Sequence, residues 1–303
     1  MDIVSLYASA GGMDYGLLLA GYTPIKAYEI DTHACETYER VTGCAIEQAD
    51  LTRIDLCSIP DSDMIIGGPP CQEFSEANSL GSVDGDKNLW PATIKIIQAK
   101  RPTFFLFENV TGLTTRHAAY FNWIVVQFKA LGYRVETRIL NAADFGVPQT
   151  RKRVFIAGRL DDRAWSWPTP THTETGDMFS QKWVSWHDVL PTGWQESAAT
   201  KDMPEWVLNR PSYQPLPQNA LFNVKDAFKD ILHRPANKPA FTVTGECIQR
   251  SRVVLDGIVY AADSLLMARI QTFPDIEMHQ KHIGNAVPPL LAKAVFSAME
   301  TAS

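Results

Sequence analysis

A cysteine in a rigid, proline-containing segment is the residue of this sequence best suited to act as a nucleophile. The run Gly67-Gly68-Pro69-Pro70-Cys71 directly follows a short apolar stretch with the pattern of a buried strand. Because proline fixes φ, the backbone before Cys71 has little freedom and presents the thiol rigidly. The alternative is that Cys71 is a small buried hydrophobic residue, as most unpaired cysteines are.

A carboxyl group follows the next apolar stretch along the chain, in Phe107-Glu108-Asn109-Val110. Neighbouring parallel strands end at the same edge of a sheet, so we expect Glu108 to lie near Cys71. A partly buried carboxyl whose pKa is raised can donate a proton to a substrate. A nucleophile beside an acid favours catalysis over the alternative of a buried, inert thiol.

Two arginines open a later apolar stretch, in Gln149-Thr150-Arg151-Lys152-Arg153. Alternation along a strand puts Arg151 and Arg153 on one face. Such a pair could hold a carbonyl oxygen or a backbone phosphate. The alternative is a solvated basic turn.

A loop of small residues, Tyr7-Ala8-Ser9-Ala10-Gly11-Gly12, follows the first predicted strand, where open α/β sheets bind ligands. Its spacing matches neither the dinucleotide fingerprint nor the P-loop, which disfavours a nicotinamide dehydrogenase. Glu29 after the second strand suits a ribose diol, and Asp50 could accept from an adenine amino group. The alternative is a small-residue turn with two helix-capping acids.

The elements that must position these residues alternate between strands and helices, which is typical of a doubly wound α/β domain with a mostly parallel sheet. The predicted strands are 3–7, 24–28, 64–66, 103–107, 133–140 and 154–157. The predicted crossover helices are 31–41, 92–100 and 119–131.

We predict three segments: a cofactor-binding and catalytic domain over 1–162, a small domain over 163–245, and a C-terminal part over 246–303 that returns to the first domain. The small domain is rich in Pro and Trp and has weak periodicity. Its tryptophans are expected in the core rather than against bases. Helical patterning returns at 264–271 and 289–299.

Length and composition exclude several classes of protein. With 303 residues, 45% hydrophobic and 20% charged, the chain is neither a fibre nor a disordered tail. It has no apolar run of about 18 residues and no signal-peptide pattern, so we expect a cytoplasmic protein without membrane attachment. Five cysteines without a C-x-x-C pair argue against disulfides, and His279 and His282 lack a third ligand, so no metal is expected.

Charge is distributed unevenly along the chain, whose net value is −6. Residues 1–94 hold 4 Lys and Arg against 15 Asp and Glu, whereas residues 95–163 hold 12 against 5. A further 8 Lys and Arg against 5 acids occur in 201–252. An acidic chain can therefore still present a basic face to a nucleic acid.

Taken together, these motifs resemble those of the C5-cytosine DNA methyltransferases. Pro-Pro-Cys-Gln from Pro69, Glu-Asn-Val from Glu108, Gln-x-Arg-x-Arg from Gln149 and Gly-Asn-Ala-Val-Pro-Pro from Gly284 occur in the order of that family. The similarity extends from Ile3 to about Val295. One motif would be weak support, but four in order are specific.

The resemblance implies S-adenosylmethionine as cofactor and S-adenosylhomocysteine as product. It implies that Tyr7 packs on the cofactor, Glu29 holds its ribose, Asp50 its adenine, and Ile30 lies against the adenine face. The residues implied to line this pocket are Tyr7, Ala8, Ser9, Ala10, Gly11, Gly12, Glu29, Ile30, Asp50, Leu51, Pro70, Asn285 and Val287.

The resemblance also implies the chemistry. Cys71 adds to C6 of cytosine, which makes C5 able to accept the methyl group. Glu108 contacts N3, Arg153 with Arg151 binds O2, and the carbonyl of Pro69 accepts from the exocyclic amine. The target cytosine must be flipped out of the duplex, and the segment 73–89 is expected to close over it.

Three places depart from the family pattern: Ser9 stands where Gly is usual, Ser5 where Asp is usual, and Ser264-Leu265-Leu266 where Pro-Arg-Glu is common. Two alternatives stay open, a tRNA cytosine-5 methyltransferase of the same fold and a non-catalytic nucleic-acid-binding homologue. The expected partner is duplex DNA bound by a monomer, with a cognate restriction endonuclease as a further candidate. The expected setting is a bacterial or phage-type nucleoid.

Overall fold

The computed structural model describes residues 1–70, 88–161, 163–225 and 230–300, without the side chain of Glu300. By its internal contacts the chain divides into two compact units. Unit 1 consists of the described residues of 1–141, 152–169 and 292–303, and unit 2 of those of 142–151 and 170–291. The segment 246–291 thus groups with unit 2, while the functional boundaries at 162 and 245 stay a prediction.

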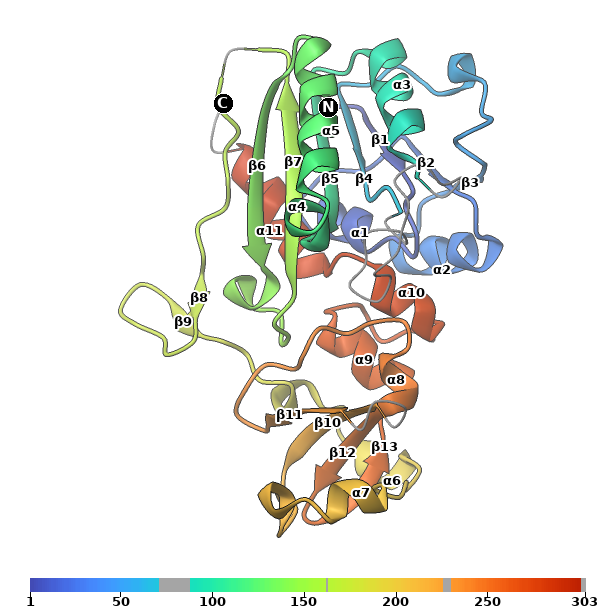
Figure 1. The fold of residues 1–303 in the computed structure, drawn as a ribbon. Coiled ribbons are helices and arrows are strands. Elements are labelled where there is room, and N and C mark those ends of the chain that lie inside the picture. The colour runs from blue at the N-terminus through green and yellow to red at the C-terminus, as the bar shows by residue number, and fades with distance from the viewer. Residues whose placement is uncertain (71–87, 162, 226–229, 301–303) are drawn as a thin grey trace. The chain divides into compact units, whose positions relative to one another are not determined.

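Unit 1 is built on a seven-stranded sheet in the order β3-β2-β1-β4-β5-β7-β6 (Figure 1). The strands are β1 (Ile3–Leu6), β2 (Lys26–Glu29), β3 (Glu47–Gln48), β4 (Met64–Gly67), β5 (Phe104–Val110), β6 (Arg134–Asn141) and β7 (Lys152–Arg159). The first five in this order pair in parallel, and β7 pairs antiparallel with β5 and β6. The prediction of a doubly wound, mostly parallel sheet is confirmed.

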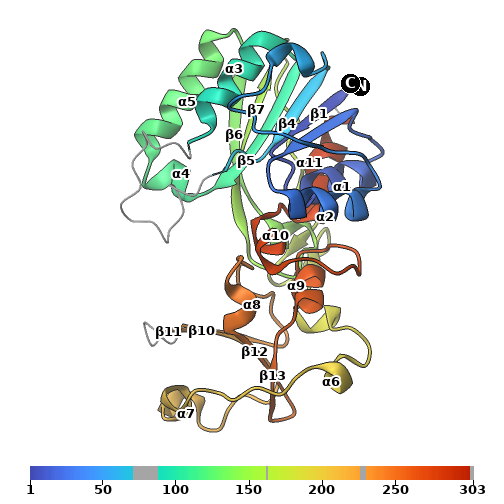
Figure 2. The same ribbon diagram turned by 90° about the vertical axis from the view of Figure 1, so that its right-hand side faces the viewer.

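Helices cover both faces of this sheet (Figure 2). The helices α1 (Gly12–Leu19), α2 (Thr32–Thr42) and α11 (Pro289–Glu300) lie on one face, and α3 (Trp90–Lys100) and α5 (Ala118–Ala130) on the other. Short turns are α4 (Gly112–Thr115), η1 (Leu56–Ser58) and η2 (Ala142–Phe145), the last in unit 2. Buried aromatic rings fill the space under α3 and α5, and they include Trp90, Phe105, Phe107, Phe128 and Tyr133.

Local signals set the helix boundaries close to where the sequence predicts them. The carboxylate of Asp31 accepts from the backbone N–H of Ala34 at 3.1 Å and so caps α2. The helix ends at Thr42 because Gly43 adopts a left-handed conformation with φ of 68°. The helix predicted over 31–41 is therefore confirmed to within one residue at each end.

Unit 2 contains a four-stranded antiparallel sheet in the order β11-β10-β12-β13. Its strands are β10 (Ala220–Lys225), β11 (Asp230–Pro235), β12 (Ser251–Leu255) and β13 (Ile258–Ala261), and a small pair is formed by β8 (His172–Thr173) and β9 (Gln181–Lys182). Its helical segments are η3 (His187–Val189), α6 (Trp194–Ser197), α7 (Glu205–Leu208), η4 (Pro211–Tyr213), α8 (Cys247–Arg250), α9 (Ser264–Ile270) and α10 (Gln280–Asn285). The sequence predicted none of these strands. In β12 all five residues are buried, so no alternation marks that strand.

The tryptophans support the expectation of a core role. Trp186 and Trp194 of unit 2 are buried, and so is Trp165 of unit 1.

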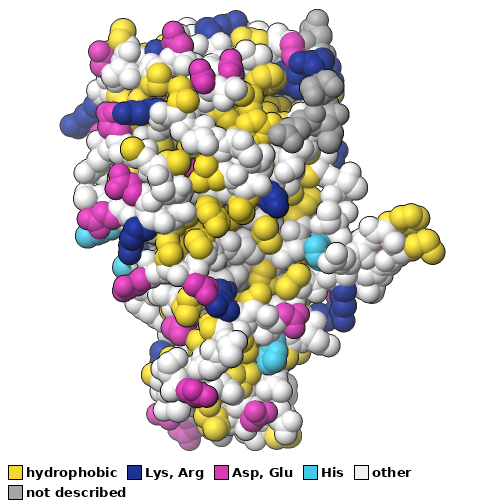
Figure 3. Space-filling view, turned by 180° about the vertical axis from the view of Figure 1, so that it is seen from behind, with side chains coloured by type: hydrophobic (Ala, Val, Ile, Leu, Met, Phe, Trp, Pro, Cys, Tyr) yellow, Lys and Arg dark blue, Asp and Glu magenta, His cyan; other side chains and the backbone are white. Residues whose placement is uncertain are grey.

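The loop between β8 and β9 exposes two large hydrophobic side chains: Met178 is 90% exposed and Phe179 is 94% exposed, and Figure 3 shows hydrophobic side chains at the tip of this loop. Among the described residues, no helix is long and apolar enough to cross a membrane.

The closest packing in the sheet predicts the effect of a single methyl group. A Cβ at Gly67 would lie 2.3 Å from the backbone oxygen of Leu6, so Gly67→Ala must push β4 away from β1. We expect a loss of about 1–3 kcal/mol in the free energy of unfolding, measured by urea denaturation. The matched control is Gly68→Ala, whose Cβ would meet the carboxylate of Glu108 at an ordinary 3.5 Å. Equal stability of the two variants would contradict this account.

Candidate active site and cofactor pocket

The loop between β1 and α1 is held in a tightly turned conformation. Tyr7, Ser9 and Gly11 have positive φ values of 53°, 50° and 81°. The N–H of Gly11 donates to the carbonyl of Ala8 at 2.9 Å, which closes the turn. Positive φ at two residues other than glycine is costly and persists only where surrounding contacts enforce it. The loop therefore has a fixed shape at the carboxyl edge of the sheet.

Glu29, the last residue of β2, supplies one of those contacts. Its Oε2 accepts from the N–H of Ser9 at 2.9 Å, and its Oε1 accepts from the N–H groups of Ile30 and Asp31 at 2.9 and 3.0 Å. Oε1 already accepts two hydrogen bonds, whereas Oε2 accepts one and keeps an acceptor site for a ribose hydroxyl. The side chain of Ile30 is 60% exposed next to this carboxylate, as a surface for a flat ring would be.

Asp50 provides a second acceptor at the same edge. Hydrogen bonds from the side chain and the N–H of Thr52 lower its pKa, and Arg53 contributes in the same direction. A backbone hydrogen bond joins the segments that carry the two acids: the N–H of Ala49, the residue before Asp50, donates to the carbonyl of Glu29 at 2.8 Å. Burial raises the pKa of Tyr7 to about 12, with a smaller contribution from the charge of Asp50. Leu51 is buried beside Asp50.

The end of β4 leads into the proline segment. The carbonyl of Pro69 accepts from Asn109 Nδ2 at 3.0 Å, which fixes its orientation and leaves one lone pair for a substrate amine. Pro70 is half-buried. Cys71 and most of the segment 73–89 lie outside the described residues, so the nucleophile and the closing loop stay predictions.

Glu108 and Arg153 form an ion pair beside this segment. The Nε of Arg153 lies 3.0 Å from Oε1 of Glu108, and the two side chains are 12% and 10% exposed. The antiparallel pairing of β5 with β7 places Arg153 opposite Val110, diagonal to Glu108. The carboxylate also lies beside Gly68, at the start of the run that leads to Cys71. A fixed carboxylate and a fixed guanidinium thus meet at the carboxyl edge of β4.

Arg151 has surroundings that differ from the predicted substrate role. It precedes β7, belongs to unit 2 and is only 1% exposed. Its Nη1 donates to the carbonyl of Val243 at 2.8 Å, and its Nη2 donates to the carbonyls of Gly284 and Ala286 at 3.0 Å each. These main-chain partners give Arg151 a structural role, and its predicted action on the substrate together with Arg153 stays a prediction.

A buried polar network in unit 2 continues from Arg151. The side chain of Gln149 donates to Oε1 of Gln271 at 2.7 Å and accepts from the N–H of Val243 at 3.0 Å. Gln271 in turn donates to the carbonyl of Ile283 at 2.6 Å. These bonds shape the turn that carries Asn285, which is exposed, and Val287, which is buried. The sequence did not predict a structural role for Gln271, because the role of a buried amide becomes visible only from its hydrogen-bond partners in the folded chain.

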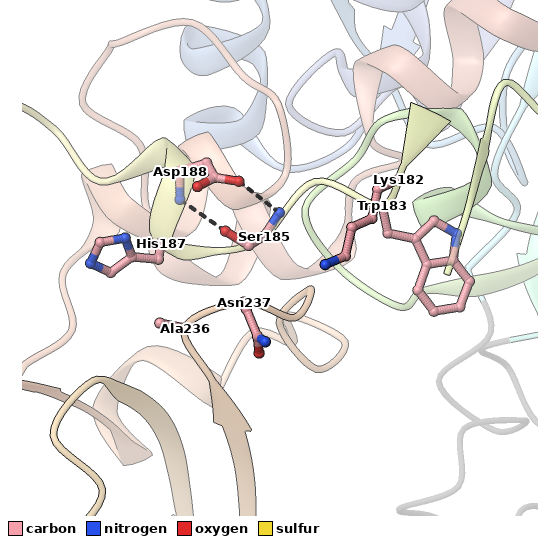
Figure 4. Close-up of a pocket in the computed structure, with 7 residues that line it drawn as sticks. All are labelled: Lys182, Trp183, Ser185, His187, Asp188, Ala236 and Asn237. Atoms are coloured by element: carbon pink, nitrogen blue, oxygen red, sulfur yellow. Dashed lines mark hydrogen bonds between the residues drawn. The ribbon is translucent and has the colours of Figure 1, made fainter. Parts of the chain in front are cut away.

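Unit 2 also contains an open cavity of about 270 Å³ (Figure 4). Polar side chains from two segments face it, and its lining consists of Lys182, Trp183, Ser185, His187, Asp188, Ala236 and Asn237. A hydrogen bond from the N–H of Ser185 to Asp188 at 3.2 Å braces one wall. The lining includes Lys182 and Asn237. In protein–DNA complexes, lysine side chains contact phosphates and asparagine side chains contact base edges.

The fold and the site define an α/β domain in which a tightly turned loop and a paired acid and cation lie at the carboxyl edge of the sheet. The family model for C-5 cytosine-specific DNA methylases matches residues 1–252. The chain therefore belongs to the C-5 cytosine-specific DNA methylases, which methylate carbon 5 of cytosine in DNA and use S-adenosylmethionine as methyl donor.

Individual relatives agree with this assignment. The chain is 30% identical to the Type II methyltransferase M1.HphI of Haemophilus parahaemolyticus over 99% of this chain and 86% of that protein. It is 31% identical to M.NgoPII of Neisseria gonorrhoeae over 99% and 95% of the two chains. The fold matches DNMT2 of Spodoptera frugiperda with a TM-score of 0.72 at 16% identity, over 99% of each chain.

The contacts of Arg151 predict that it acts mainly on stability. Arg151→Met leaves three buried carbonyls without their donor, and we expect the free energy of unfolding to fall by about 3 kcal/mol or more. The control is Lys152→Met at the exposed neighbouring position, for which a change within about 0.5 kcal/mol is expected. Urea denaturation measures both. Full stability of Arg151→Met together with lost activity would return Arg151 to the substrate site.

Proposed function

We propose that this chain binds S-adenosylmethionine at the loop 7–12 and transfers its methyl group to C5 of a cytosine in duplex DNA. The observation that carries the proposal is the Glu108–Arg153 ion pair beside Gly68, at the edge where β1, β4 and β5 end. An acid and a cation fixed within 3.0 Å of each other can contact adjacent atoms of one small ring.

The residues at the loop fit this cofactor. Glu29 keeps an acceptor site on Oε2 for a ribose hydroxyl, Asp50 is an ionised acceptor for the adenine amine, and Ile30 offers an exposed apolar side chain. Tyr7, Ala8, Ser9, Ala10, Gly11 and Gly12 form the turn that we propose surrounds it, and Leu51 and Pro70 are the residues predicted to flank it. Asn285 and Val287 belong to unit 2, and their contribution rests on the family resemblance. When bound, the cofactor supplies an electrophilic methyl group on a sulfonium.

On the substrate, Cys71 would act as thiolate and form a bond to C6 of cytosine. The electron pair of the C5–C6 double bond then moves into the ring, where Glu108 as the protonated acid gives its proton to N3 and Arg153 donates a hydrogen bond to O2. C5 would then accept the methyl group, and S-adenosylhomocysteine would be released. Loss of the C5 proton to a base, for which a bound water is a candidate, departure of the Cys71 sulfur and return of the N3 proton to Glu108 restore the aromatic ring.

The ion pair prepares both groups for this step. Arg153 also donates through Nη1 to the carbonyl of Lys152 at 2.8 Å, so its guanidinium is held at two points and keeps donors for O2. The oriented carbonyl of Pro69 can accept from the exocyclic amine, which distinguishes cytosine from a uracil-like base. Because these groups cannot reach C6 within a stacked duplex, the base must be flipped out.

We further propose that unit 2 contacts the DNA, with Lys182 and Asn237 as candidate contacts in its open cavity. The names of the Type II relatives support a modification role alongside a restriction endonuclease. Co-purification of this chain with an endonuclease from its own host, and size-exclusion of the DNA complex, would test the endonuclease partner and the expected monomer.

A covalent trap tests the reaction. A duplex carrying 5-fluorocytosine should form a stable adduct in the presence of S-adenosylmethionine, because fluorine cannot leave C5 as a proton does. Cys71→Ser should abolish the adduct, and Glu108→Gln should slow methyl transfer by about 10²–10⁴-fold. The control is Glu39→Gln on the exposed face of α2.

The same assay separates the two alternatives. Transfer of labelled methyl to tRNA and not to duplex DNA would overturn the DNA substrate. Cofactor binding without any adduct would show a non-catalytic homologue. Bisulfite sequencing of DNA from expressing cells reports the methylated sequence.

DNA affinity should fall steeply with salt despite the net charge of −6. If Lys182 contacts a phosphate, Lys182→Ala should reduce the slope of log K against log salt by about 1. Lys95→Ala, at an exposed position of α3, is the matched control and should leave the slope unchanged. A flat salt dependence of the parent protein would contradict a phosphate-contacting surface.

A further inference from the structure

A carboxylate is buried directly behind the cofactor loop. Asp14, in the first turn of α1, has no exposed surface. Its Oδ2 accepts from the hydroxyl of Ser5 on β1 at 2.9 Å, and its Oδ1 accepts from the hydroxyl of Tyr38 on α2 at 3.1 Å. One acid thus joins the strand before the loop, the helix after it and the neighbouring helix.

The partners of Asp14 also touch the loop itself. A Cβ built on Gly11 would lie 2.9 Å from Cδ2 of Tyr38 and 2.8 Å from Cγ2 of Thr42, so the Tyr38 ring packs against the loop backbone. Ser5 is only two residues before Tyr7, where the loop begins. A change in the position or charge of Asp14 therefore acts on the loop through Ser5 and Tyr38, which lie directly beside it.

Keeping this carboxylate ionised is unfavourable for folding. Burial raises the pKa of Asp14 to about 6, although the hydroxyls of Ser5 and Tyr38 lower it in part. Its contacts in the described part of the chain are hydroxyls and a peptide N–H rather than a Lys or Arg. The folded chain holds the proton more tightly than the unfolded chain, so stability falls as pH rises from about 4 to about 6. Such a cost suggests that the charge serves a function.

We propose that ionised Asp14 acts as an electrostatic positioning residue that favours the cationic sulfonium of S-adenosylmethionine over the neutral thioether of the product at the loop 7–12. This inference rests on the proposed function. The two ligands differ by one positive charge at sulfur. A buried negative charge behind the loop, at an effective dielectric constant of about 20, is expected to change their affinity ratio on the order of tenfold.

The groups around Asp14 allow its effect to be separated from other titrations. Tyr38 is the titratable group that faces it from α2, with Cys44 beyond, and burial raises the pKa of Tyr38 far above neutrality. Glu29 and Asp50 lie on the ligand side of the loop. Any effect of these acids persists in a variant of Asp14, so the comparison of wild type with that variant isolates one carboxyl.

Calorimetric titration with each ligand at about pH 5 and about pH 7, below the usual α-amino pKa, tests the proposal. The wild-type preference for S-adenosylmethionine over S-adenosylhomocysteine should rise on the order of tenfold between these pH values. In Asp14→Asn it should stay at the low value. Glu36→Gln, which removes an exposed acid of α2, should follow the wild type. A preference that rises equally in Asp14→Asn overturns the proposal.

A second variant guards against a folding defect in Asp14→Asn. Tyr38→Phe removes one donor to the carboxylate while keeping the ring, so the rise in preference should move to higher pH. An unchanged midpoint would overturn the proposal. Failure of the wild type to bind either ligand would refute the proposed cofactor instead. Thermal unfolding gives a further readout, because the Tm of Asp14→Asn relative to wild type should be higher at about pH 7 than at about pH 4.

Discussion

The register of three adjacent parallel strands is the constraint on which the site in unit 1 depends. Leu6 of β1 lies opposite Gly67 of β4, and Gly67 lies opposite Phe107 of β5. The cofactor loop, the proline segment and Glu108 therefore follow at a common edge. A shift by one residue would carry Glu108 to the other face of the sheet, since side chains alternate along a strand. Gly67 permits this register because it has no side chain to meet the Leu6 carbonyl.

The antiparallel strand β7 adds the cation. It lies between β5 and β6, and its first residues run beside the end of β5, so Arg153 reaches Glu108. Arg151, two residues earlier, satisfies three backbone carbonyls in unit 2. A buried guanidinium needs acceptors for its donors, and main-chain carbonyls supply them without a second charge. The two arginines of this short motif therefore have different partners: Arg153 pairs with a carboxylate, and Arg151 binds main-chain carbonyls.

The acids of residues 1–94 show why net charge is a weak guide to partners. Glu29 binds the N–H of Ser9 in the loop and those of Ile30 and Asp31 after β2, Asp31 caps α2, and Asp14 joins β1, α1 and α2. Each carboxylate accepts hydrogen bonds within a few ångströms, so its role is local. The overall value of −6 sums over these local roles and says little about the surface that meets DNA.

The sequence by itself determined the doubly wound, mostly parallel fold and the helices over 31–41, 92–100 and 119–131, because hydrophobic periodicity and caps are local signals. The adjacency of Glu108 to the Gly67-Gly68 segment also followed, since parallel strands end at one edge. Only the tertiary structure gave Arg151 its three main-chain partners, buried Asp14 beside Tyr38 and formed the sheet of unit 2. These features depend on contacts between residues far apart in the chain, and no pattern within a short window specifies such contacts.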